Sequence, residues 1–161
     1  MTSPPLNNPG VRFPPPLIFV VGFGLGWIIH QKVLELRLAD DARLAGIAEV
    51  LGLLAVIGGL DLMAWGFLTF RRAHTSLVPH REASQLVETG PYRFTRNPMY
   101  GGLTLIYVGG AAIANSIWPL IMLPAVLMLL FRLVIAREER YLETAFGASY
   151  REYRTKVGRW F

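Results

Sequence analysis

The sequence contains no cysteine and only three histidines. The absence of cysteine excludes disulfide bridges, thiolate metal sites and cysteine nucleophiles. His74 and His80 have no carboxylate–histidine cluster around them, so we expect a solvated loop there and predict no metal site. Internal repeats and low-complexity segments are also absent, and a length of 161 residues fits one domain.

Charge is scarce as well, because charged residues make up 17% of the chain and hydrophobic residues 53%. This balance is more apolar than that of a soluble domain of similar length. Four apolar segments stand out, at residues 15–34, 44–70, 99–114 and 117–136. A helix needs about 20 residues, rising about 1.5 Å each, to cross about 30 Å of hydrocarbon. We therefore predict an all-α integral membrane bundle with about four transmembrane helices, of which the third is short.

The connections between these segments predict further features. Only Asn115 and Ser116 separate the third and fourth segments, which favours a tight antiparallel hairpin. Residues 138–157 carry apolar side chains at spacings of three or four, which is typical of an amphipathic helix at the membrane interface. Gly147 interrupts that pattern and predicts a bend. No small-residue cleavage site follows the first segment, so we expect a membrane helix there and not a signal peptide.

Lysine and arginine are distributed unevenly between the two sides of the bundle. Five of them lie in residues 71–96 and six in the tail from residue 137, which makes eleven, against three in residues 31–43. The positive-inside rule then places the long loop and the tail in the cytoplasm. We expect an integral protein of a bacterial inner membrane with both termini cytoplasmic. The basic clusters suit anionic membrane lipids, and no nucleic-acid partner is predicted.

We divide the single membrane domain, residues 1–161, into three parts. Residues 1–16 contain six prolines and should form an extended lead. Residues 17–98 should hold the first two helices and the cytoplasmic loop. Residues 99–161 should hold the helical hairpin and the tail, where we expect the cofactor site.

Several residues within the apolar segments allow two interpretations. Asp61 lies nine residues before Phe70, which is about 13 Å along a helix, and faces either an active cavity or a hydrogen-bonding neighbour helix. Arg132, near the inner end of the fourth segment, either snorkels to the interface or joins the site. The glycines of the third segment either pack closely against another helix or leave a groove for a lipid chain.

Two motifs carry most of the chemistry. The first joins the basic loop to the third segment and reads Gly90-Pro91-Tyr92-Arg93-Phe94-Thr95-Arg96-Asn97-Pro98-Met99-Tyr100-Gly101. The second follows the fourth segment and reads Arg137-Glu138-Glu139-Arg140. Both are expected where lipid meets water, on the same side of the membrane. Adjacent glutamates point about 100° apart on a helix, so one can bind a ligand while the other pairs with an arginine.

From Gly90 onward, the chain resembles the isoprenylcysteine carboxyl methyltransferase and phospholipid methyltransferase superfamily of membrane enzymes. The matching residues are Gly90-Pro91-Tyr92-Arg93, Arg96-Asn97-Pro98-Met99-Tyr100-Gly101, Glu138-Glu139, Phe146-Gly147, Tyr150, Tyr153, Val157 and Arg159. The family pattern usually has a histidine where this chain has Asn97. An amide forms hydrogen bonds but does not titrate, so a binding role suits Asn97 better than an acid–base role.

The resemblance implies a methyltransferase that uses S-adenosylmethionine in a cytoplasm-facing pocket made by the last two helices and the tail. Arg96 suits the cofactor carboxylate, a glutamate suits its ammonium or ribose hydroxyls, and a tyrosine ring suits adenine or the sulfonium. We expect Arg96 and Glu139 to be catalytic. The expected cofactor-binding residues are Tyr92, Arg96, Asn97, Pro98, Tyr100, Glu138 and Glu139.

The acceptor is expected to be a lipophilic small molecule or lipid that enters from the bilayer. A carboxylate acceptor loses charge when it attacks a sulfonium, and a dry pocket favours that loss. An amine acceptor would first have to lose a proton, with Glu138 or Glu139 as the candidate base.

Two other functions stay open from the sequence. Sterol reductases have a similar C-terminal region and bind NADPH, whose phosphates would meet the arginines, but this chain is much shorter. Alternatively, a four-helix protein with a basic surface would bind lipids or a partner without catalysis.

Overall fold

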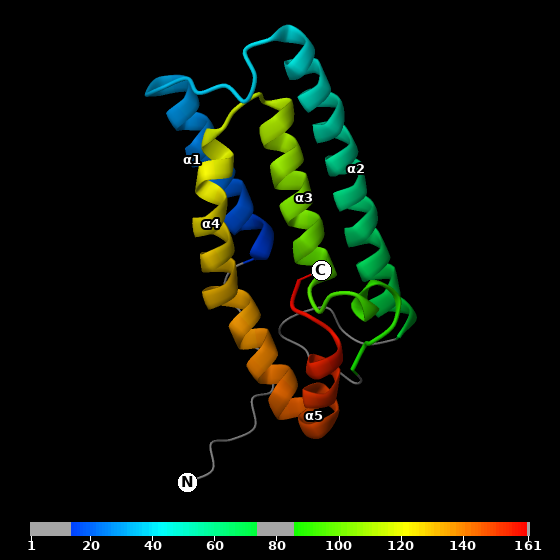
Figure 1. Ribbon diagram of the computed structural model, residues 1–161. Helices are drawn as coiled ribbons and strands as arrows, with labels where there is room; N and C mark the ends of the chain where they lie inside the picture. The colour runs from blue at the N-terminus through cyan, green and yellow to red at the C-terminus, as the bar shows by residue number, and fades with distance from the viewer. Residues whose placement is uncertain (1–13, 74–85, 161) are drawn as a thin grey trace.

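The computed structural model describes residues 14–73 and 86–160, and all regular structure in that part is helical. His74, His80 and most of the proline-rich lead lie outside the described residues. The helices are α1 (Pro15–Lys32), α2 (Ala42–Arg72), the short 3₁₀ helix η1 (Gly90–Arg93), α3 (Pro98–Ile113), α4 (Trp118–Leu130), the π-helical turn η2 (Phe131–Ile135) and α5 (Ala136–Lys156). Figure 1 labels α1 to α5. The all-α prediction is confirmed.

Helix starts follow the local chemistry of the chain. Proline occupies the first or second position of α1, α3 and α4. The N–H groups at these positions form no hydrogen bond within the helix, so the missing N–H of proline costs nothing there. The Asp41 side chain caps α2 by accepting hydrogen bonds from the backbone N–H groups of Arg43 at 2.9 Å and Leu44 at 3.0 Å. This cap starts α2 two residues before the apolar run that predicted it.

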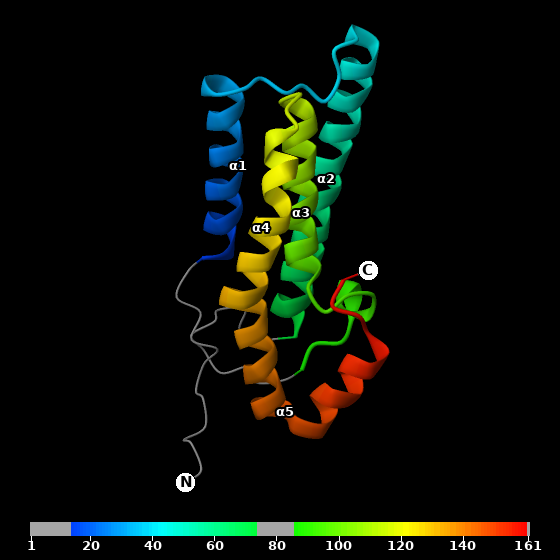
Figure 2. The same cartoon turned by 60° about the vertical axis from the view of Figure 1, so that its left-hand side comes forward.

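Helices α1 to α4 alternate in direction, so α2 and α4 run the same way along the bundle (Figures 1 and 2). The turn between α3 and α4 places Asn115 at a φ of 46°, a left-handed conformation that asparagine tolerates. The Asn115 side chain also binds both backbone groups of Ala39, at 3.0 and 2.9 Å, and so fixes the link between α1 and α2. The antiparallel hairpin is present as predicted.

Glycines set the distance between α2 and α3. A Cβ built on Gly59 would lie 2.6 Å from the carbonyl oxygen of Gly102, and one built on Gly102 would lie 2.6 Å from that of Gly59. Gly52 and Gly109 meet in the same way two turns further along. Of the two interpretations of the glycines in α3, close packing is therefore the one that the structure supports at Gly102 and Gly109.

The chain from α4 to α5 is one continuous helix with two irregularities. The π-helical turn η2 lies where the apolar part ends, and Gly147 breaks the helix with φ 52° and ψ −116°. A residue with a side chain is strained at such a positive φ, so glycine permits the predicted bend. Beyond the bend, the end of the chain turns back toward α3 (Figure 2).

Two helices in the described part are long and apolar enough to cross a membrane, α2 and the continuous helix Trp118–Lys156, while α3 is a shorter apolar helix. Asp61 and Arg132 are exposed on the outside of the bundle. Asp61 therefore faces no interior cavity and bonds to no neighbouring helix within the described residues. Neither interpretation of Asp61 drawn from the sequence holds.

The contact between α2 and α3 predicts opposite effects for two glycine substitutions. Gly59→Ala places a methyl group against the Gly102 carbonyl, so we expect a loss of about 1–3 kcal/mol of stability. Gly46→Ala, at a position with nothing within 4 Å of the added Cβ, should be neutral or stabilising by up to about 1 kcal/mol. Thermal unfolding of both variants in one detergent measures the difference. Equal melting temperatures would contradict the close contact.

Candidate functional site

The first motif lies between the end of α2 and the end of α5. Gly90 has a φ of 60°, and a Cβ there would lie 2.5 Å from Thr69 Oγ1. The buried Tyr92 ring meets Phe70 edge-on at 5.0 Å, and the Tyr153 hydroxyl donates to the Tyr92 carbonyl at 2.7 Å. Contacts from both helices therefore fix the chain just before Arg96.

Glu139 forms ion pairs with two arginines from separate segments. Arg96 Nη1 donates to Glu139 Oε1 at 2.8 Å, and Arg159 donates to both carboxylate oxygens at 2.9 Å. The side chains of Arg96 and Glu139 are only 9% and 15% exposed. Arg159 also lies over the Phe131 ring at 4.7 Å. A bidentate pair of this kind fixes orientation as well as distance.

The last described residues bind back onto the first motif through their backbone. Arg96 N donates to Gly158 O at 2.9 Å and Arg96 Nε to Val157 O at 3.1 Å. The carbonyl of Arg159 accepts from Thr95 Oγ1 at 2.9 Å and from Asn97 Nδ2 at 3.2 Å. The tail thus covers residues 95–97 and is part of the site.

Glu138 faces a different partner from Glu139, as their adjacent positions predict. Its Oε1 accepts a hydrogen bond from the Tyr100 hydroxyl at 2.8 Å. Burial raises the pKa of Glu138, and the nearby Glu139 charge adds to this effect, although the Tyr100 bond opposes it. Glu138 therefore favours its neutral form more than an exposed glutamate does.

The pKa of Glu139 moves in the other direction. Burial alone would raise it, but the hydrogen bonds from Arg159 and the charges of Arg96 and Arg159 outweigh burial and hold the pKa below its ordinary value of 4.5. Both glutamates lie beyond the apolar part of their helix. Two adjacent carboxyls thus have pKa values shifted in opposite directions at one end of the bundle, which is a common property of functional sites.

The structure brings most of the predicted site residues together. Arg96 contacts Glu139, Asn97 contacts the tail, and Tyr100 contacts Glu138. Pro98 opens α3 and is buried beside Gly66 of α2, so it shapes the backbone. The roles of these residues toward a cofactor stay predictions.

Arg159 and Tyr150 also belong to the site and were missing from the predicted set. Tyr150 is buried and accepts a hydrogen bond from Arg96 Nη1 at 3.2 Å. Both residues are part of the family pattern quoted from the sequence, so that pattern contained the signal. The pairing with Arg96 and Glu139 depends on the bend at Gly147, which brings both residues back to the motif.

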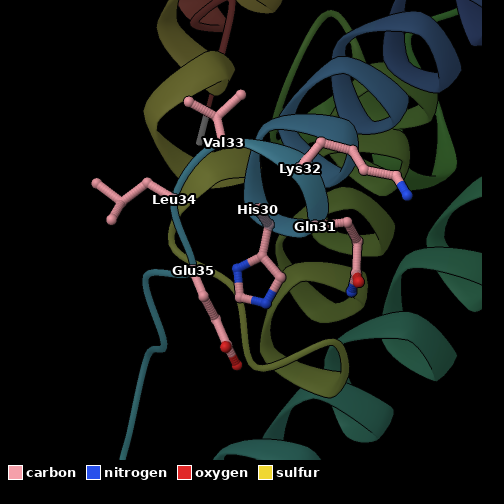
Figure 3. A pocket seen from close by; sticks show the side chains of 6 residues that line it. All are labelled: His30, Gln31, Lys32, Val33, Leu34 and Glu35. Carbon is pink, nitrogen blue, oxygen red and sulfur yellow. The ribbon is translucent and has the colours of Figure 1, made fainter.

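A separate cavity lies at the other end of α1 (Figure 3). Its lining residues are His30, Gln31, Lys32, Val33, Leu34 and Glu35. The His30 ring stacks on Trp27 at 5.5 Å, and its Nδ1 has no hydrogen-bond partner among the described residues. This end of the bundle is opposite the one that holds α5 (Figure 1), so the cavity is not part of the candidate site.

A family comparison identifies the chain. The family model for phospholipid methyltransferases matches residues 47–149. This range includes both motifs and covers more than half of the chain, so the chain belongs to this family of integral membrane proteins. Enzymes of the family are S-adenosylmethionine-dependent membrane methyltransferases.

Curated relatives carry a related description. The chain is 30% identical over 126 residues to Saccharomyces cerevisiae protein-S-isoprenylcysteine O-methyltransferase, covering 77% of this chain and 53% of that protein. It is 32% identical over 108 residues to Arabidopsis thaliana protein-S-isoprenylcysteine O-methyltransferase B, covering 66% and 55%. A probable enzyme of the same description from Oryza sativa subsp. indica is 29% identical over 135 residues, covering 83% and 71%.

The chain thus spans about half the length of the first two of these relatives. No solved structure matches the chain.

The two glutamates should respond differently to neutral replacement. At pH 7.5, Glu139→Gln leaves Arg96 and Arg159 without a carboxylate. This change should lower the free energy of unfolding by about 2 kcal/mol or more. Glu138→Gln keeps an acceptor for Tyr100 and removes the cost of burying an ionisable group, so it should leave stability unchanged or raise it. Thermal unfolding of the two variants measures this difference.

The Glu139 effect should also depend on pH. The pKa of Glu139 in the folded protein lies below its ordinary value of 4.5. The stabilisation from its ion pairs is therefore complete above the pKa of the unfolded state and is lost as pH falls through the pKa of the folded state. The difference in stability between wild type and Glu139→Gln should therefore shrink in acid. A difference that stays constant down to pH 3 would show that the ion pairs are not its source.

Proposed function

We propose that this protein transfers a methyl group from S-adenosylmethionine to a lipophilic acceptor at the membrane interface. The observation that supports this most is the meeting of the two family motifs at one end of the bundle. Arg96 and Glu139 come from segments far apart in the sequence and form an ion pair at 2.8 Å. Glu138 and Tyr100 form the neighbouring contact at 2.8 Å.

The charges of the site suit the amino-acid end of this cofactor. Arg96 and Arg159 contribute two positive charges and Glu139 one negative charge, which leaves a formal net charge of +1. The Nη2 group of Arg96 makes no hydrogen bond within the described residues, so it can donate to a carboxylate. Burial raises the pKa of Glu138, and a bound ammonium group beside it would favour its ionised form.

The remaining residues would position the reactants. When bound, S-adenosylmethionine supplies an electrophilic methyl group on a sulfonium. The tail and Asn97 would hold the motif backbone in place, and the rings of Tyr92 and Tyr100 would flank the cofactor. In-line geometry supplies much of the rate in such a transfer. A carboxylate acceptor needs no base, whereas an amine acceptor would pass its proton to Glu138.

The placement in the membrane is also a proposal. Helices α1 to α4 would each cross the bilayer, with α3 using its flanking residues to reach the interface. The part of α5 after Gly147 would lie at the interface with its basic residues toward anionic lipids. The positive-inside rule then puts the site in the cytoplasm of a bacterial inner membrane.

Cofactor binding tests this function against the alternatives. Purified protein in detergent should bind S-adenosylmethionine and should not bind NADPH. Arg96→Ala should weaken that binding by about 30-fold, because a charged hydrogen-bond partner in a partly buried site is worth about 2 kcal/mol. Calorimetric titration measures the affinity of the wild type and of the variant for each cofactor. Arg151→Ala, at an exposed position on α5, is the matched control and should bind normally.

NADPH binding would favour a reductase of the sterol-reductase type. Binding of neither cofactor would favour a lipid-binding or partner-binding protein without catalysis. Normal S-adenosylmethionine affinity in Arg96→Ala would show that Arg96 has only a structural role.

The acceptor should prefer the bilayer over water. In a series of acceptors with one nucleophile and increasing alkyl length, kcat/KM should rise with each added methylene, by up to about 0.8 kcal/mol per buried CH₂. The rise should stop once the available apolar surface is covered. Flat efficiency, or a preference for the shortest acceptor, would favour an aqueous substrate.

A further inference from the structure

Asp61 and Arg132 are opposite charges on the outside of the bundle, and neither contacts the candidate site described above. Asp61 lies on α2 and Arg132 on η2, and both are exposed. Neither makes a hydrogen bond or an ion pair within the described residues. Their neighbours on the same surfaces are exposed apolar side chains, Ile57 and Leu68 on α2 and Met128 and Leu129 on α4. In a membrane protein, such surfaces meet hydrocarbon or another helix.

Asp61 has no charged partner one turn away on its own helix. The residues at those positions are Ile57, Gly58, Ala64 and Trp65. Ionisable groups among apolar side chains in a membrane are costly and usually pair with another polar group. A polar partner outside the single chain would therefore stabilise Asp61.

Asp61 and Arg132 lie at the same level of the bundle. On α2, Asp61 lies between Gly59, which contacts Gly102, and Gly66, which contacts Met99. Met99 comes 16 residues before Asn115, and Arg132 comes 16 residues after Ser116. Since α3 and α4 leave the same turn in antiparallel directions, these equal separations place Arg132 at the level of Met99. Gly59 meets the Gly102 backbone, so Asp61, two residues further along the antiparallel α2, lies at the level of Tyr100, next to Met99.

The two charges also lie on opposite sides of the molecule. Both views show α2 on one side of α3 and α4 on the other (Figures 1 and 2). Helices α2 and α4 run in the same direction. Two copies inserted in the same orientation would therefore present Asp61 and Arg132 at equal depth on surfaces that can meet.

We propose that copies of this chain associate side by side in the membrane, with Asp61 of one copy paired with Arg132 of the next. Gly58 lies about one turn before Asp61 and has nothing within 4 Å of an added Cβ, so a neighbouring helix can approach closely there. The second copy is the partner because it carries the complementary charge at the matching depth. Such a contact joins two different surfaces and closes into a ring when the rotation between copies permits.

Charge exchange tests the pairing. Copies with a donor or an acceptor dye at the N-terminus are reconstituted into lipid vesicles, and energy transfer is followed as the protein density changes. Asp61→Arg and Arg132→Asp should each weaken association by about tenfold or more. The double variant Asp61→Arg/Arg132→Asp should restore it. Glu49→Arg, a charge reversal at another exposed position of α2, is the matched control and should leave association unchanged.

Cross-linking tests the surfaces themselves, and the absence of native cysteine gives a clean background. Ile57 and Met128 each lie four residues before one of the paired charges. A mixture of Ile57→Cys and Met128→Cys chains should form a disulfide-linked dimer on mild oxidation in vesicles. Either variant alone should not. A mixture of Ile57→Cys with Leu25→Cys, which places its cysteine on the exposed surface of α1, should also stay unlinked.

Several results would overturn the proposal. These are a monomer at every density, single reversals without effect, or a double variant as weak as the single ones. Efficient cross-linking of Ile57→Cys with itself would indicate a symmetric contact between α2 helices instead. Association needs no bound cofactor, so S-adenosylmethionine titration of the same variants distinguishes a failure of this contact from a failure of the proposed methyl transfer.

Discussion

The ion pairs of the Glu139 carboxylate are the interaction on which the rest of the site depends. Without this carboxylate, the neighbouring positive charges of Arg96 and Arg159 would repel each other. Only 9% of the Arg96 side chain and 15% of the Glu139 side chain are exposed, so water screens these charges little. Glu139 therefore joins three segments, the approach to α3, the start of α5 and the end of the described chain. The hydrogen bonds between residues 95–97 and 157–159 lie beside these ion pairs and hold the tail in the same place.

The helices contribute mainly by fixing where this charged cluster lies. Gly59 and Gly102 bring α2 and α3 into backbone contact, so the start of α3 cannot slide along α2 without a clash. The π-helical turn and the Gly147 bend then direct α5 away from the bundle and back toward Arg96. Polar side chains are thereby placed at the end of an apolar structure, which is the arrangement that the proposed methyl transfer would require.

The sequence predicts the number and order of the elements well, because apolar length and turn residues determine them. The hairpin at Asn115, the bend at Gly147 and the different partners of Glu138 and Glu139 follow from local chemistry. The orientation of each helix does not, since a helix that is apolar on every side carries no periodic signal for its buried face. This explains why the outward position of Asp61 was not predicted. The Arg159 pair was missed because it depends on the direction of the tail after the bend.

Asn97 shows how the chain can depart from its family pattern without losing the site. Its Nδ2 donates to the Arg159 carbonyl at 3.2 Å, so the side chain contributes a hydrogen bond to the tail. A histidine ring nitrogen at this position could donate to the same carbonyl, but asparagine cannot take up or release a proton. The substitution thus keeps a donor and removes a titrating group. An amine acceptor would then need Glu138, the buried acid with a raised pKa, as its base, whereas a carboxylate acceptor would need no base.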